Sequence, residues 1–174
     1  MRRFGQRQGR RLLFGCKVAA IGAVLMLASV PAVQAETTQF TAELKGSTEV
    51  PANRIAGTGT FTATYDSATK QLTWNGTYSG LSGPATAAHI HGPAPVGQNA
   101  RLVVWVSDNI GQCSQGQCVS KNDASTPPLA SPFKGSAALT DAQIPEMTAG
   151  LYYLNIHTDA HPAGELRGQL VKAP

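Results

Sequence analysis

Short segments in which apolar or aromatic residues alternate with polar ones recur along the chain, separated by clusters of Gly, Pro, Asn, Asp and Ser. Because successive side chains of a β-strand point to opposite faces, this period of two predicts half-buried strands. A more continuous apolar run at 102–106 indicates a strand with deeper burial. The pattern predicts eight strands, at residues 40–44, 61–65, 72–78, 87–91, 102–106, 133–139, 151–157 and 165–171.

No sustained helical period accompanies these strands. One helical turn is predicted at 140–143, where Thr140 can cap and Gln143 occupies the capping-box position. Many short strands at fairly regular spacing predict an all-β fold class, a single-domain antiparallel Greek-key β-sandwich or flattened barrel. The composition agrees, because only 14% of the 174 residues are charged, which excludes coiled-coil and acidic disordered chains.

The first 35 residues have the pattern of a secretory signal peptide. Basic residues crowd the first 17 positions, an uncharged apolar run follows at 18–30, and Val33-Gln34-Ala35 supplies small residues for cleavage. The apolar run is shorter than the ~20 residues of a permanent membrane span. We therefore expect an exported protein, periplasmic or extracellular, with a Sec-type signal favoured over a twin-arginine signal and no permanent membrane span after cleavage.

The formal net charge of +4 belongs to that leader. Residues 36–174, the expected mature domain, carry eight Lys or Arg against ten Asp or Glu, a formal charge of −2. The remaining basic residues are scattered singly, so no basic stripe is available to follow phosphates, and nucleic acid is excluded as a partner.

Two cysteines, Cys113 and Cys118, remain in the mature chain within a polar loop. In an oxidising compartment this pair is expected to form a disulfide, worth about 2 kcal/mol for so short a ring. A metal or redox role is the alternative, although the spacing is not that of a Cys-x-x-Cys motif.

The pair His89 and His91 is the first candidate for metal chemistry. Side chains at positions i and i+2 of a strand leave the same face about 6.5–7 Å apart, so the two imidazoles can converge on one ion. If Ile90 and Ile156 both face the core, His157 joins the pair on the outer face of the sheet. These histidines can equally be surface or hydrogen-bonding residues.

Other residues near this set are secondary candidates. The same alternation places Asn155 on the face of His157 and sends Glu165, Arg167 and Gln169 outward from the last strand. The remaining histidine, His161, lies in a loop before Pro162 and is more typical of a structural or exposed residue than of an extra ligand.

Several motifs resemble the chordin-type (CHRD) domain family across residues 40–170. They are FTAELKG at 40–46, EVP at 49–51, AHIHGP at 88–93, GLYYLNIHT at 150–158 and GELRGQL at 164–170. The family includes extracellular and exported microbial proteins, so the resemblance implies a secreted β-domain at 36–174 without defining its function.

A more distant likeness is to the copper/zinc superoxide dismutases, through LKG at 44–46, GLS at 80–82, the His-Ile-His segment, and GELR at 164–167. It implies a Greek-key barrel, with an immunoglobulin-like sandwich as the alternative. It also implies copper ligands at His89, His91 and His157, with Arg167 guiding an anion. The chain has no histidine between His91 and His157, so the zinc and bridging ligands of that family are missing.

Three hypotheses follow. The first is an exported protein that binds one copper ion, with zinc second, through His89, His91 and His157, with Arg167 and Asn155 as anion-guiding or supporting residues. The second is a metal-free module that binds an extracellular or periplasmic protein or another polymer. The third is a copper-only, dismutase-like enzyme, and the sequence favours a non-enzymatic role over it.

Overall fold

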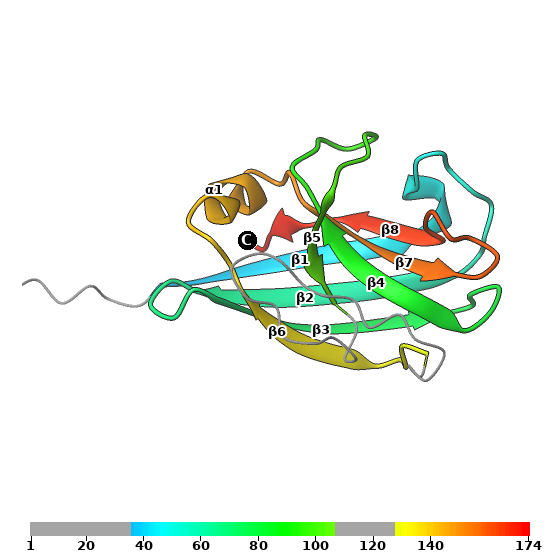
Figure 1. The fold of residues 1–174 in the computed structure, drawn as a ribbon, viewed down its shortest axis with the longest axis horizontal. Helices are drawn as coiled ribbons and strands as arrows, with labels where there is room; N and C mark the ends of the chain where they lie inside the picture. Colours follow the sequence, from blue (N-terminus) through cyan, green and yellow to red (C-terminus); the bar gives the residue numbers. More distant parts are fainter. Residues whose placement is uncertain (1–35, 107–127) are drawn as a thin grey trace, which may run out of the picture. The chain divides into compact units, whose positions relative to one another are not determined.

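The computed structural model describes residues 36–106 and 128–174 (Figure 1). Its regular elements follow the predicted order, with one 3-10 turn, one short helix and nine strands. The elements are β1 (Thr37–Lys45), η1 (Gly46–Thr48), β2 (Thr58–Asp66), β3 (Gln71–Ser79), β4 (Ala85–His91), β5 (Leu102–Trp105), β6 (Phe133–Ala138), α1 (Gln143–Thr148), β7 (Tyr153–Thr158), β8 (Leu166–Gln169) and β9 (Val171–Lys172).

The strands form one antiparallel sheet in the order β5-β4-β7-β8-β1-β2-β3-β6, and β9 pairs separately with β1. The strands β1, β2 and β3 are sequential neighbours, whereas β6 lies beside β3 and β7 beside β4, as in a Greek-key chain path. Figure 1 shows the sheet curving strongly, with β3 and β6 on one side and β4, β7 and β8 on the other. The all-β prediction is therefore confirmed as a nearly closed, barrel-like sheet.

The two ends of the sheet approach each other near the start of β4. Leu129, just before β6, forms an isolated bridge with Ala85, and its N–H donates to the Ala85 carbonyl at 2.9 Å. Tyr78 on β3 also donates its hydroxyl hydrogen to the Leu129 carbonyl. These bonds narrow the opening between β4 and β6 in the described part of the chain.

The inward-facing residues of both sides of the sheet meet in a single core. Ile90 and Ile156 are both fully buried, which confirms the alternation predicted for β4 and β7. The same cluster contains residues of the other strands and of α1, including Phe40, Leu44, Phe61, Leu72, Trp74, Phe133, Met147 and Leu166. With Ile90 and Ile156 facing inward, their neighbours on β4 and β7 are placed on the opposite face.

The helix α1 begins at Gln143, the last residue of the predicted turn, and its N-cap residue is Ala142, which makes no side-chain capping hydrogen bond. The Thr140 N–H donates to the Gln143 side-chain oxygen at 2.7 Å, one of the two hydrogen bonds of a capping box. Pro145 lies in the first turn, where the helix does not need its missing N–H. The expected signal peptide and the Cys113–Cys118 disulfide lie outside the described residues.

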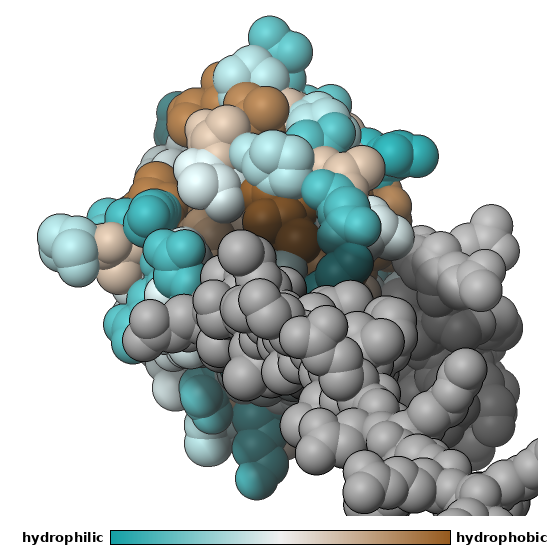
Figure 2. Space-filling view, turned by 90° about the vertical axis from the view of Figure 1, so that its left-hand side faces the viewer, coloured by the Kyte–Doolittle hydropathy of each residue, from teal (hydrophilic) through white to brown (hydrophobic). Residues whose placement is uncertain are grey.

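Figure 2 views the domain from the left-hand side of Figure 1 and shows hydrophobic residues set among hydrophilic ones. The exposed large hydrophobic residues of the described part are Val96 and Val171. Within residues 36–106 and 128–174, no helix has the length and apolar character needed to cross a membrane.

Candidate metal centre

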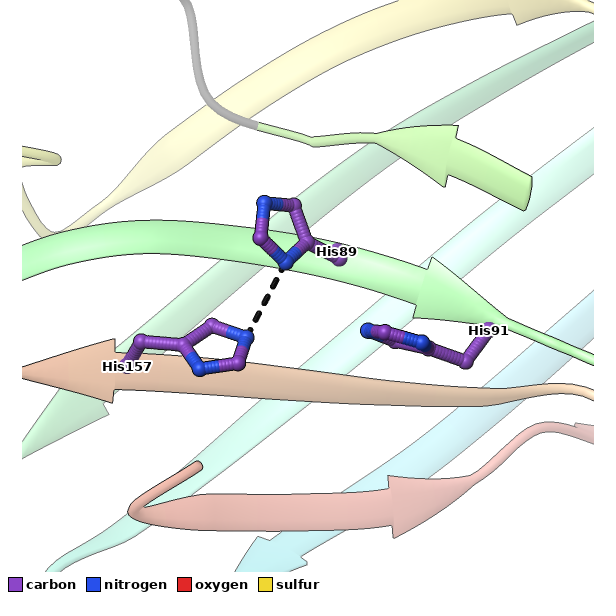
Figure 3. A group of neighbouring side chains, drawn as sticks. All are labelled: His89, His91 and His157. Carbon is purple, nitrogen blue, oxygen red and sulfur yellow. Dashed lines mark hydrogen bonds between the residues drawn. The ribbon is translucent and has the colours of Figure 1, made fainter. Parts of the chain in front are cut away.

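The three predicted histidines come together on the outer face of the β4–β7 pair (Figure 3). In the register of these strands, Ala87 lies opposite His157 and His89 lies opposite Asn155. His157 is therefore diagonal to His89, within reach of long side chains on the same face. Two strands that are distant in the chain, β4 ending at His91 and β7 beginning at Tyr153, thus supply one cluster.

Ring nitrogens of the three histidines are close enough to share an ion. The His89 Nδ1 and His157 Nε2 atoms are 3.0 Å apart, and one donor atom from each of the three residues lies within 4.8 Å of the others. Imidazole nitrogens bind Zn²⁺ at about 2.0–2.1 Å, so two nitrogens 3.0 Å apart can contact the same ion. The structure therefore brings three donor atoms together, with two of them already at a distance that one ion can span.

Backbone carbonyls fix the tautomers of two of these rings. The Nδ1 atom of His91 lies 3.0 Å from the Ala100 carbonyl, and the Nδ1 atom of His157 lies 3.1 Å from the Pro162 carbonyl. Because a carbonyl only accepts, each Nδ1 carries the hydrogen and each Nε2 presents a lone pair. This is the outer hydrogen bond that metal-binding histidines ordinarily make.

His89 is oriented by a neighbouring aromatic ring. The Trp105 ring on β5 packs edge-on against it, with ring centroids 4.2 Å apart and an interplanar angle of 89°. Its Nδ1 atom faces His157, whereas its Nε2 atom is buried without a hydrogen-bond partner. The His91 Nε2 atom is likewise buried and unpartnered, and it presents a lone pair to the cluster. Because the His157 Nε2 atom accepts, the His89 Nδ1 atom carries the hydrogen between them, so His89 can bind an ion through Nδ1 only when that hydrogen moves to Nε2.

Burial keeps the three imidazoles neutral. It is the main cause that lowers the pKa of His91 and His157, and together with the two neighbouring histidines it lowers the pKa of His89 to about 3. Neutral imidazole is the form that binds metal. The three donors, the tautomers of His91 and His157, and the neutral state of the rings therefore fit a divalent or monovalent transition-metal ion.

Arg167 and Tyr153 form a second layer next to His91. The Tyr153 ring stacks on His91 with centroids 5.1 Å apart and an angle of 6°, and the Arg167 guanidinium carbon lies 3.4 Å from the Tyr153 ring centre. Arg167 donates from Nη1 to the Asn99 side-chain oxygen at 2.9 Å and from Nη2 to the Gln98 carbonyl at 2.6 Å. These contacts tie the 92–101 loop to β8.

The outward faces of β7 and β8, to which the alternation assigned Asn155, Glu165 and Arg167, are covered by other parts of the chain. Arg167 is 2% exposed and Glu165 is fully buried. The Glu165 carboxylate accepts hydrogen bonds from the Ser82 N–H and hydroxyl, each at 2.6 Å, and from Thr158. The alternating pattern predicts the correct face for Arg167. It does not predict that the 92–101 loop covers that face.

The other candidates take different places. Asn155 lies between His89 and Arg167 in the register, and its Oδ1 atom is buried without a partner. His161 lies outside the cluster and forms a backbone turn with Thr158. No described contact therefore brings His161 to the other three histidines as an extra ligand.

Sequence reasoning missed two side chains and two carbonyls of the site. Tyr153 shares the face of His157 by alternation, and Trp105 lies in the predicted fifth strand, so pattern alone could have placed both near the cluster. The carbonyls of Ala100 and Pro162 leave no trace in the sequence, because any residue has a carbonyl and only the loop conformation aims it.

The fold and site together define an all-β domain with a partly buried cluster of three histidines on one face of its sheet. The family model of the CHRD domain matches residues 40–170. The chain therefore belongs to the CHRD domain family. No curated protein and no solved structure matches the chain, so the likeness to copper/zinc superoxide dismutases stays a prediction.

Proposed function

We propose that this CHRD domain binds one copper ion, with zinc as the weaker alternative, in an exported protein that buffers or delivers the metal. The ligands are the Nε2 atoms of His91 and His157 and the Nδ1 atom of His89, whose hydrogen moves to its own Nε2 atom when the ion binds. The observation that carries the proposal is the approach of one donor nitrogen from each ring to within 4.8 Å. Copper leads the affinity order for imidazole-rich sites.

The residues around the ligands would act on the metal indirectly. The Ala100 and Pro162 carbonyls hold two rings in the ligating tautomer, and Trp105 limits rotation of the third. A bound copper ion can cycle between two oxidation states, which is the chemistry that a dismutase-like activity would require. Both hydrogen bonds that the structure describes from Arg167 go to the 92–101 loop. They give no particular support to the enzyme alternative, in which Arg167 would guide an anion.

Metal content of the purified protein tests the proposal. We expect about one copper per chain after exposure to equimolar Cu²⁺ and Zn²⁺, with nitrogen hyperfine structure in the copper EPR spectrum. The variant His89→Ala/His91→Ala/His157→Ala should lose this binding, whereas His161→Ala should retain it.

Two other outcomes would contradict the proposed copper site. Absence of stoichiometric copper or zinc, or binding unchanged in the triple variant, would exclude the three-histidine site. The His89–His157 hydrogen bond would then be a structural contact of a metal-free interaction module. Superoxide consumption by copper-loaded protein, lost in the triple variant, would instead identify an enzyme.

A further inference from the structure

Arg167 places a positive charge inside the protein next to the histidine cluster. Its side chain is 2% exposed, and neither ion pair of the described residues includes it. A guanidinium group does not lose its proton in proteins, so this charge persists at every working pH. A buried charge is costly unless nearby groups stabilise it.

The described hydrogen bonds of Arg167 go to neutral groups. The buried carboxyl of Glu49 also interacts with its charge, but burial raises the pKa of Glu49 to about 7, so at pH 6 this carboxyl is mostly protonated and offsets little of that charge. The guanidinium donates to the Asn99 side chain and the Gln98 carbonyl, and it lies 3.4 Å from the centre of the Tyr153 ring. Carbonyl oxygens and an aromatic face solvate a cation without cancelling its charge. The field of Arg167 therefore extends into its surroundings.

The histidine cluster lies within that field. The Tyr153 ring links the guanidinium to His91, because it contacts both. Burial is the main cause that lowers the pKa of His91, and the charge of Arg167 lowers it further. A cation held by the same imidazoles would experience the same repulsion.

We infer that Arg167 tunes the metal site toward the monovalent ion, Cu⁺, at the expense of Cu²⁺. This inference rests on the copper site proposed above. One electron from an external reductant such as ascorbate converts Cu²⁺ to Cu⁺ and lowers the charge of the ion by one. The repulsion by Arg167 is then halved, so the reduced state gains relative stability.

The size of the effect follows from Coulomb's law. For charges about 10 Å apart at an effective dielectric constant of about 20, one unit of ionic charge changes the ratio of Cu⁺ to Cu²⁺ affinity roughly tenfold. A tenfold change corresponds to about 59 mV in a one-electron reduction potential. Shifts of this size are measurable by redox titration with mediators.

Three variants separate the charge of Arg167 from its shape. Measured at pH 6, Arg167→Met removes the charge, Arg167→Lys keeps it as long as the buried amine stays protonated, and Asn99→Asp places a carboxylate where the guanidinium already donates a hydrogen bond. The matched controls are Lys134→Met and Asn75→Asp, which change the same charges at exposed positions on β6 and β3.

We expect Arg167→Met and Asn99→Asp each to lower the Cu²⁺/Cu⁺ reduction potential by about 59 mV, a tenfold effect. Arg167→Lys and both controls should remain close to wild type. If Arg167→Met does not fold, Asn99→Asp decides the question, because it changes an exposed side chain with almost no change in size.

Each contrary outcome has its own meaning. Copper binding with an unchanged potential in Asn99→Asp overturns the inference and leaves the proposed copper site in place. A potential that falls equally in Arg167→Lys and Arg167→Met, and does not rise in Arg167→Lys as the pH is lowered to protonate a buried amine, also overturns it, because the shape of the guanidinium and not its charge would then be responsible. A wild-type protein without copper overturns both proposals.

Discussion

At the scale of single residues, burial of His89 links the stability of the metal-free protein to pH. Its pKa is about 3 in the folded protein, compared with an ordinary value near 6.5. Between these values the unfolded chain binds a proton that the folded chain excludes, so the contribution of His89 is complete above pH 6.5 and decreases toward pH 3. For one such group the loss is on the order of 3 kcal/mol by pH 4.

Urea denaturation with EDTA, from pH 8 to pH 4, measures this contribution as the difference between wild type and His89→Gln. The difference is needed because burial raises the pKa of Glu49 to about 7, and that carboxyl acts in the opposite sense. Its stabilising contribution is present at low pH and lost as the pH rises through 7. His161→Gln should retain the full wild-type dependence, and identical pH profiles for wild type and His89→Gln would contradict the prediction.

For single residues, the sequence pattern predicts the face of the sheet on which a side chain lies but not whether that side chain is buried. Alternation placed His89, His91 and His157 on one face because Ile90 and Ile156 had to be buried, and the structure has this arrangement. Glu165 shows the converse, because alternation does not report what covers a face. Its burial depends on hydrogen bonds from Ser82, which is 83 residues away in the chain.

At the scale of elements, the loop from 159 to 165 positions His157. The Pro162 carbonyl in this loop faces the His157 Nδ1 atom, and the loop contains Gly164 at a φ of +134°. A Cβ atom at Gly164 would lie 2.4 Å from the Glu49 Oε1 atom and 2.9 Å from the Asn155 Nδ2 atom. Glu49 and Asn155 are both buried, so neither can move aside into solvent.

We expect Gly164→Ala to lower the free energy of unfolding by at least ~2 kcal/mol, because it combines backbone strain with overpacking. Gly97→Ala is the matched control: its φ is also positive, at +83°, but nothing lies within 4 Å of the added Cβ. That variant should lose only about 1 kcal/mol, the cost of the backbone conformation. Chemical denaturation of both variants tests the comparison, and equal losses would show that the contact with Glu49 is unimportant.

Elements were more predictable than their connections. Each of the eight predicted segments contains a strand because half-buried strands impose a period of two on the sequence. The predicted last segment is divided into β8 and β9, which pair with different stretches of β1. The 92–101 loop has no such period, so its role in covering β7 and β8 depends on long-range contacts such as the bond from Arg167 to Asn99.

At the scale of the whole molecule, the proposed metal would join two strands that are distant in sequence. His89 and His91 lie on β4 and His157 on β7, next to the region where the curved sheet remains open. The unfolded chain holds these residues far apart and cannot present the same site. A ligand that binds the folded state alone stabilises it by RT ln(1 + [L]/Kd).

We therefore expect copper at a free concentration of 100 times its Kd to raise the free energy of unfolding by about 2.7 kcal/mol. For a domain of this size, that gain should raise the melting temperature by several degrees. Thermal unfolding with copper and with EDTA measures the shift. His161→Ala should show the same shift as wild type, whereas the variant lacking His89, His91 and His157 should show none. Equal melting temperatures of the wild type with copper and with EDTA would mean that the cluster stabilises the sheet through its own hydrogen bonds, without a metal.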